Sequence, residues 1–132
     1  MNTRRQIIFI GFAFLVMLVW LIYTQFFMTD QLRRVIIEYG LDKIIHALGG
    51  AWVAALFLLH GEKKIFRLLV FTVLIAVLWE MGELLFDPEV QYFFARKKNL
   101  WLQDSLSDIA SAFLGAIVYR FTQLEKAARP CR

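Results

Sequence analysis

Three hydrophobic segments of this chain each carry a pair of ionisable residues three or four positions apart. The pairs are Asp42 with His46, Glu80 with Glu83, and Asp104 with Asp108. Residues at this spacing share one face of a helix, so each segment would present two ligands in one direction. Ionisable groups at membrane depth are energetically unfavourable and mark functional sites by default. The spacing therefore predicts a functional cluster of five carboxylates and one imidazole.

A divalent metal site is the chemistry that this cluster predicts first. Carboxylates with an imidazole suit zinc, manganese or iron, and carboxylates alone suit magnesium or calcium. Neighbouring carboxylates cannot all stay ionised without counter-charge. A bound cation, shared protons, or basic side chains from a nearby loop would each supply it, and the sequence leaves these three open. The predicted metal ligands are His46, Glu80, Asp104, Asp108 and Asp42.

The composition is that of a membrane protein. Of the 132 residues, 60% are hydrophobic and 16% aromatic, with a mean hydropathy of +0.59, against about 45–50% apolar residues in soluble domains. Four apolar runs are long enough to cross a bilayer, which takes roughly 20 residues. The expected spans are 7–28, 42–59, 65–86 and 104–122. We therefore expect a single membrane domain with an all-α fold, an integral four-helix bundle.

The connecting segments have distinct characters. Residues 29–41 are polar with an amphipathic pattern, which predicts a short interfacial helix ended by Gly40. Asp87-Pro88 should stop the third helix. Residues 88–103 should form the longest loop, in which Arg96, Lys97 and Lys98 could bind a phosphate.

An antiparallel order of the helices would bring the three pairs to one end of the bundle. Asp42–His46 begins one helix, Glu80–Glu83 lies near the end of the next, and Asp104–Asp108 begins the last. A rise of about 1.5 Å per residue puts His46, Glu80 and Asp108 at similar depth. Simpler roles stay open for some members: Asp42 and Asp104 as helix caps, and His46 as a hydrogen-bonded core histidine.

Basic residues predict the orientation in the membrane. The end with the two termini carries nine Lys and Arg residues and the end with the acidic cluster six, when the whole chain is counted. The positive-inside rule then puts both termini in the cytoplasm. The net charge of +4 is explained by these loop and tail residues and does not indicate nucleic-acid binding; the expected partners are membrane lipids.

Several of these residues together resemble the VanZ-like family of small bacterial membrane proteins. The resemblance rests on Asp42-Lys43-x-x-His46, Glu80-x-x-Glu83, Arg96, and Asp104-x-x-x-Asp108 with Gly115, and covers about residues 42 to 118. The chain departs from the family pattern at Glu83 and Asp108, where Gln and Asn are usual. The resemblance implies the bacterial inner membrane and a link to the cell envelope and to resistance against teicoplanin-type glycopeptide antibiotics.

These features favour a cation-binding membrane protein that acts on an envelope lipid or a lipid-linked envelope precursor. If it is an enzyme, it is a metal-dependent hydrolase with zinc, manganese or magnesium as the metal. Glu80 and Glu83 are then the catalytic residues, with Glu83 either as general base or as a support for the metal ligands, and Asp42 either orients His46 or binds the metal. A proton or cation relay and a non-catalytic accessory protein of the envelope are the alternatives.

Overall fold

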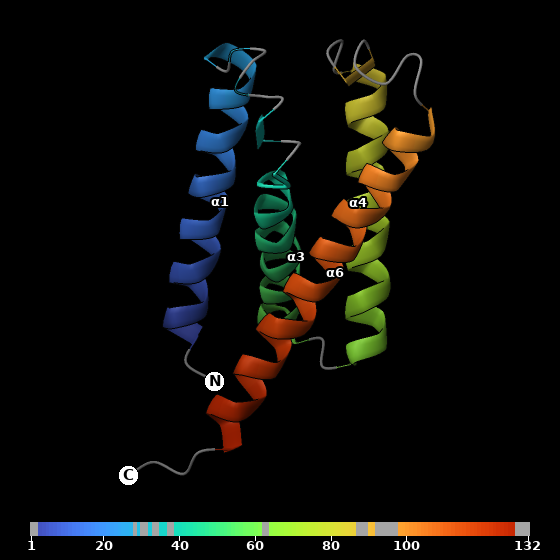
Figure 1. Cartoon of the computed structure of the whole chain (residues 1–132). Coiled ribbons are helices and arrows are strands. Elements are labelled where there is room, and N and C mark those ends of the chain that lie inside the picture. Colours follow the sequence, from blue (N-terminus) through green and yellow to red (C-terminus); the bar gives the residue numbers. More distant parts are fainter. Residues whose placement is uncertain are drawn as a thin grey trace.

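The computed structural model describes residues 3–27, 29, 32, 35–36, 39–61, 64–86, 90–91 and 98–128. For Gln25, Lys98 and residues 126–128 it describes the backbone and not the side chains. This part of the chain is all-α and contains no strand. Its four helices are α1 (Thr3–Phe26), α3 (Asp42–Leu59), α4 (Ile65–Phe86) and α6 (Lys98–Ala128). They alternate in direction, so α3 and α6 begin at the end where α1 and α4 finish (Figure 1). We call this the site end.

The bounds expected for the second and third helices are confirmed, at 42–59 and 65–86. The first helix begins four residues earlier than expected, at Thr3. The expectation for the fourth was wrong: α6 begins at Lys98, so residues 98–103 are helical and do not belong to a loop. The segment from Lys98 to Ala128 contains no proline, and Leu100 and Trp101 let the helix continue upstream of its acidic residues.

Three of the four helices are long and apolar enough to cross a membrane: Thr3–Thr24 within α1, and the whole of α3 and α4. The fourth helix is not among them, since Gln103, Asp104 and Asp108 lower the hydropathy of its first half. A membrane protein is therefore indicated by three helices, and the expected span at 104–122 stays a prediction.

The most extensive helix contact joins α3 and α6, whose backbones touch directly. A Cβ atom on Gly50 would overlap the backbone of Ala112, and one on Gly115 would overlap the backbone of Ala47. Small residues at helix crossings let backbones approach this closely in membranes. In Figure 1, α6 runs obliquely across α3 and α4. The crossing point lies about one turn from His46 and Asp108.

A buried stripe on α4 faces the other helices. Leu68, Thr72, Ala76 and Glu80 are its buried residues, each four positions from the next. Leu68 belongs to the apolar core at the end opposite the site, which also contains Leu58 and Tyr119. Phe71 on α4 stacks on Phe57 of α3, with ring centroids 4.9 Å apart. Glu80 thus continues an otherwise nearly apolar stripe toward the site end.

Helix α1 packs mainly against α3. Gln6 is buried and donates from Nε2 to the carbonyl of Ala55 at 2.7 Å, and Trp52 donates from Nε1 to the carbonyl of Ile10 at 3.1 Å. Phe9 stacks on Tyr119 of α6. Most of the remaining α1 surface is apolar and exposed, as expected where a helix faces lipid.

The interfacial helix expected between the first two spans is described in part. Leu32, Val35 and Ile36 are helical, and the other residues of 30–38 lie outside the described part. Gly40 has φ 62°, and the N–H of Leu41 bonds back to the carbonyl of Ile36 at 2.9 Å. This is the geometry of a helix that ends on a left-handed glycine.

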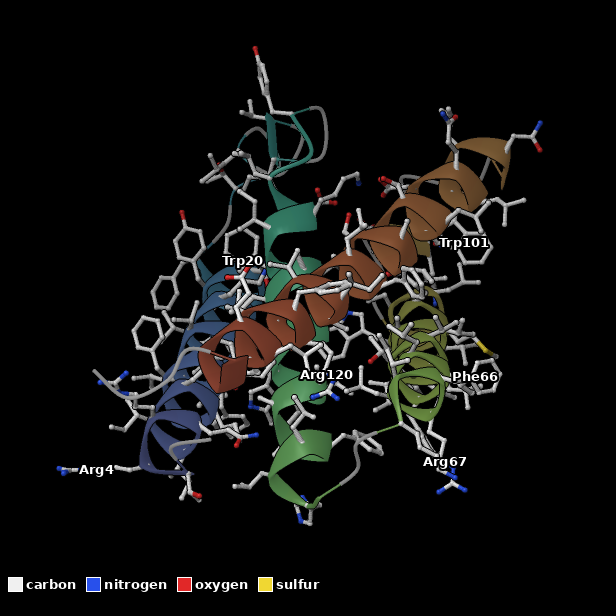
Figure 2. All side chains as sticks on the ribbon, turned by 90° about the horizontal axis from the view of Figure 1, so that it is seen from below. Arg4, Trp20, Phe66, Arg67, Trp101 and Arg120 are labelled. Atoms are coloured by element: carbon white, nitrogen blue, oxygen red, sulfur yellow. The ribbon has the colours of Figure 1, made fainter. Side chains whose placement is uncertain are left out.

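Basic side chains lie at the end opposite the site. Seen from that end, Arg4 and Arg67 point away from the helices, whereas Arg120 lies among them (Figure 2). This distribution agrees with the lysine and arginine bias of the sequence, and the orientation in the membrane stays a prediction.

Candidate metal centre

Three helices contribute one side chain each to a buried group at the site end. His46 comes from α3, Glu80 from α4 and Asp108 from α6, and one ligand atom of each lies within 4.8 Å of the others. His46 Nδ1 is 3.7 Å from Glu80 Oε1, and His46 Nε2 is 3.9 Å from Asp108 Oδ2. These are the three residues that helical rise placed at a common depth.

A second acidic group lies beside the first, around the ammonium of Lys43. Lys43 Nζ donates to Asp104 Oδ1 and to Asp108 Oδ1, both at 3.0 Å, and lies 3.6 Å from Asp42 Oδ1. The carboxylates of Asp42, Asp104 and Asp108 could also hold a cation by their geometry. In the structure, Lys43 already provides the positive charge there.

Asp108 belongs to both groups. Its Oδ1 accepts from Lys43 and its Oδ2 faces His46, and only 3% of the residue is exposed. The α3–α6 crossing explains this placement: Gly50 is one turn after His46, Ala112 is one turn after Asp108, and their backbones touch. The crossing therefore brings the side chains of His46 and Asp108 toward each other.

Glu80 is buried in the centre, with an exposed fraction of 6%. Its Oε1 has no hydrogen-bond partner among the described residues. Ser105 Oγ, on the same face of α6 as Asp108, is also buried and has no such partner there. Buried polar atoms normally find a partner, and an exception needs an explanation such as an ion or water.

Among the residues that the structure describes, the charges of the centre do not balance. The two groups contain four carboxylates, namely Asp42, Glu80, Asp104 and Asp108, against the single ammonium of Lys43. With all four ionised and His46 neutral, three negative charges remain. Buried charges are tolerated when they are paired or coordinate a metal. The buried acidic and histidine groups could therefore hold a metal ion, whose identity the residues alone do not fix.

The capping roles considered for Asp42 and Asp104 are not what the structure shows. Leu41 occupies the N-cap position of α3, with no side-chain cap, and Asp42 is the first helical residue. Its Oδ1 accepts from the adjacent N–H of Lys43 at 3.0 Å. Asp104 lies six residues inside α6. Both carboxylates face Lys43 instead.

The structure does not bring every predicted site residue into these groups. Glu83 lies one turn beyond Glu80, where its Oε1 accepts from Trp79 Nε1 at 2.7 Å, and it joins neither set of possible metal ligands. Arg96, Lys97 and the side chain of Lys98 lie outside the described residues. Asp87 does so too.

Two residues of the centre were missed by the sequence reasoning. Lys43 appeared only in the orientation count and in the motif of the family resemblance, with no role in the site, although it stands three residues before His46 and thus on the same helical face. Ser105 stands three residues before Asp108 in the same relation. The spacing rule that selected the acidic pairs would have selected both, had basic and hydroxyl side chains been included.

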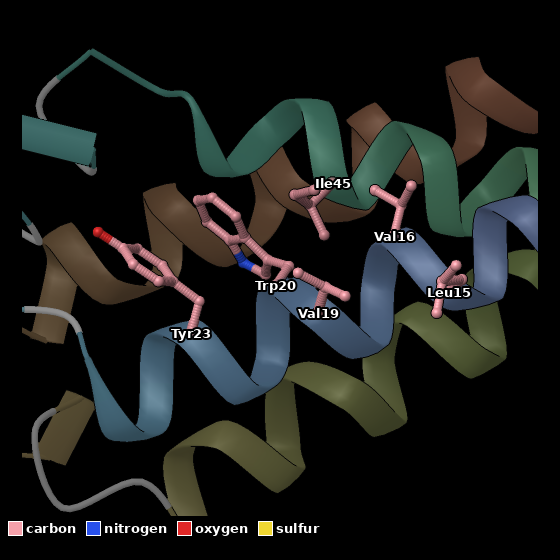
Figure 3. A pocket seen from close by; sticks show the side chains of 6 residues that line it. All are labelled: Leu15, Val16, Val19, Trp20, Tyr23 and Ile45. Atoms are coloured by element: carbon pink, nitrogen blue, oxygen red, sulfur yellow. The ribbon is translucent and has the colours of Figure 1, made fainter.

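An apolar groove lies between α1 and α3 toward the site end. Its volume is about 370 Å³, and its lining residues are Leu15, Val16, Val19, Trp20, Tyr23 and Ile45 (Figure 3). Leu15 and Val19 are more than half exposed, so the groove opens sideways from the helices. Ile45 immediately precedes His46 in α3, so the groove and the metal-capable group lie at the same level of the bundle, on different faces of α3.

Comparison with models of protein families, with curated proteins and with solved structures gives no match for this chain. The resemblance to VanZ-like proteins therefore stays a prediction carried by the residues quoted for it. The geometry of the centre is what bears on function.

Proposed function

We propose that this membrane protein binds one divalent cation between His46, Glu80 and Asp108 and uses it to hydrolyse a lipid headgroup. The observation that carries the proposal is the buried Glu80 carboxylate, whose Oε1 faces an imidazole and has no hydrogen-bond partner among the described residues. A cation there would satisfy Glu80 and offset the excess negative charge of the centre.

The spacing of the donor atoms allows a small metal ion if the three side chains draw closer. Zinc bonds of about 2.0–2.2 Å to nitrogen and oxygen separate tetrahedral ligands by roughly 3.4 Å. The distances of 3.7 Å and 3.9 Å start from different nitrogens of His46, of which a metal would bind only one. With one ligand atom from each residue, the donors lie within 4.8 Å of one another, so metal binding would draw them together by up to about 1.4 Å. One imidazole with two carboxylates suits zinc or manganese, with magnesium as the harder alternative.

Three protein ligands leave a coordination position for water, which is the arrangement of catalytic rather than structural zinc sites. A bound metal lowers the pKa of that water and can stabilise charge on a phosphoryl or acyl oxygen. Glu83, the next carboxylate along α4, is the general base of this scheme. Arg96, Lys97 and Lys98 would meet a phosphate of the substrate.

The groove between α1 and α3 supports a lipid as the substrate. Its walls are apolar, it opens beside the exposed face of α1, and it lies at the level of His46, which follows Ile45 in α3. An acyl or prenyl chain in the groove would leave its polar head near the centre. The proposed substrate class is therefore an envelope lipid or a lipid-linked precursor in a bacterial inner membrane.

A proton or cation relay receives less support. A relay needs ionisable groups that continue from the centre toward the opposite end. Below the centre, the buried faces that α3, α4 and α6 present within the described part are mostly apolar: Gly50, Ala54, Leu58, Ala76, Thr72, Leu68, Ala112 and Ala116. Thr72 donates its hydroxyl to the carbonyl of Leu68, so it is already engaged.

The proposal is tested by measuring how much metal the wild type, Glu80→Gln and Glu83→Gln bind. Detergent-purified protein would be stripped with chelator, equilibrated with Zn²⁺, Mn²⁺ or Mg²⁺, and analysed by elemental mass spectrometry. We expect about one equivalent in the wild type, a loss of affinity of about 100-fold or more in Glu80→Gln, and no loss in Glu83→Gln. A direct metal ligand and a carboxylate outside the ligand set differ in this way.

Activity is tested on the metal-loaded protein with phospholipids and polyprenyl diphosphates, by release of phosphate or of the headgroup. Glu83→Gln should lower turnover while it leaves the metal in place. Wild-type protein that takes up none of the three metals would rule out the proposed function and return the centre to shared protons or a structural role.

A further inference from the structure

The two acidic groups of the centre differ in what fills them. Asp42, Asp104 and Asp108 surround Lys43 Nζ, at 3.6, 3.0 and 3.0 Å. His46, Glu80 and Asp108 surround no described cation, and Glu80 Oε1 there is buried without a hydrogen-bond partner among the described residues. The ligand atoms of both groups lie close enough together to hold a metal ion, and Asp108 is common to the two groups.

The ammonium of Lys43 lies where a second cation would lie. It offers three donors and no acceptor, and three carboxylates stand around it. Charge-assisted hydrogen bonds of this kind are about twice as strong as neutral ones, and the surroundings are partly buried. A metal could enter this group only if it displaced the ammonium from all three carboxylates.

We infer that Lys43 is a built-in cation that takes the place of a second metal ion and restricts the centre to a single metal. The inference rests on the proposed function, because it assumes that His46, Glu80 and Asp108, which we call the His46 group, bind a metal. Lys43 also acts as a positioning residue: its bond to Asp108 Oδ1 turns Oδ2 toward His46. The lysine thereby determines both the number of metals and the orientation of a shared ligand.

Removal of the ammonium should open the second group. In Lys43→Met, the side chain keeps a similar length and loses its charge, so Asp42, Asp104 and Asp108 become available to metal. We expect Mn²⁺ equilibrium binding to rise from about one equivalent in the wild type to about two in Lys43→Met. Lys43→Arg retains the positive charge and should stay at one.

A double variant identifies where the additional metal binds. In Lys43→Met with Asp104→Asn, the second group loses one of its three carboxylates, and the stoichiometry should return to about one. In Lys43→Met with Glu80→Gln, the first group is damaged instead, and the remaining equivalent belongs to the second. An additional equivalent that survives Asp104→Asn does not bind around Lys43 and would overturn the inference.

The outcomes separate this inference from the proposed function. One equivalent in both wild type and Lys43→Met overturns the role of Lys43 and leaves the proposed function intact. Two equivalents in the wild type overturn it as well. No metal in the wild type overturns both.

A measurement on the wild type covers the case in which Lys43→Met does not fold. The electron paramagnetic resonance spectrum of the Mn²⁺-loaded wild type should show the six-line pattern of an isolated ion. A spectrum of two coupled Mn²⁺ ions would contradict a centre that Lys43 restricts to one metal.

Discussion

The contact between α3 and α6 and the contact between α3 and α4 are built in different ways. The first brings two backbones together at Gly50 and Gly115, with no side chain between them. The second is less extensive and is mediated by side chains such as the stacked rings of Phe57 and Phe71. A backbone contact tolerates almost no added volume, whereas a side-chain contact can repack.

The centre draws its residues unequally from these contacts. Lys43 with its carboxylate partners Asp42, Asp104 and Asp108 forms what we call the Lys43 group. All of its members lie on α3 or α6, the two helices in backbone contact. Glu80 alone comes from α4. The comparison implies that the Lys43 group is preformed, whereas a metal in the His46 group also ties α4 to the other two helices.

The largest effect is expected from Gly115→Leu. The new side chain would overlap the backbone of Ala47, so α3 and α6 must move apart, at a cost of about 3 kcal/mol, the upper end for overpacking. Both acidic groups should be lost with the crossing. Unfolding by SDS titration, followed by circular dichroism, measures the stability, and Mn²⁺ binding measures the centre.

Gly11→Leu is the matched control for this change. Gly11 lies in α1, and a Cβ there meets nothing within 4 Å, so its stability and metal binding should equal those of the wild type. Equal tolerance of leucine at Gly11 and Gly115 would contradict the direct contact of α3 and α6.

An intermediate effect is expected from Phe71→Ala. Loss of the ring stack with Phe57 removes about 1 kcal/mol from the docking of α4, which corresponds to about a fivefold loss of metal affinity if Glu80 moves with its helix. The Lys43 group should remain intact. Mn²⁺ titration monitored by electron paramagnetic resonance measures the affinity.

Phe66→Ala removes a ring of the same size from the exposed face of the same helix, where 76% of Phe66 is accessible. It should leave the metal affinity unchanged. If both variants weaken metal binding equally, the effect does not come from the contact between α3 and α4.

The smallest effect is expected from Gln6→Ala. Gln6 bonds α1 to the carbonyl of Ala55, and side-chain hydrogen bonds between membrane helices contribute about 0.6 kcal/mol on average. Since α1 supplies no ligand, metal stoichiometry and affinity should not change. Ile7→Ala, at an exposed neighbouring position, is the control for the SDS titration, and a change of metal affinity in Gln6→Ala would show that α1 takes part in the centre.

Much of the fold could be predicted from hydropathy, because Asp42 and Gly61 bound α3 and Lys64 and the Asp87-Pro88 pair bound α4 in the sequence. The start of α6 could not. Acidic residues are common in the first turn of a helix, so the sequence predicts a start at Asp104. Hydropathy does not show whether a helix begins at the membrane surface or several residues earlier, in the water. The oblique crossing of α6 also depends on Gly50 and Gly115 together, which sequence spacing identifies only as small residues.

The centre was predictable to the extent that helical geometry determines it. Spacing and rise brought His46, Glu80 and Asp108 to one place, as the structure has them. The division into two groups was not predictable, because it depends on which oxygen of Asp108 faces Lys43 and which faces His46. Side-chain direction at a helix crossing comes from tertiary packing and not from the sequence period.

The length of α6 has a further consequence. Its 31 residues extend over about 46 Å, whereas the hydrocarbon layer of a bilayer is about 30 Å thick, and the helix lies obliquely in the bundle (Figure 1). Tilt is how a long helix adapts to bilayer thickness. Gly50 and Gly115 fix the point at which α6 crosses α3. A change in bilayer thickness should therefore rotate α6 about this crossing point and displace Asp104 and Asp108, which lie on one side of it. The lipid composition of the membrane would then change the distances among the acidic residues and His46 without contacting them.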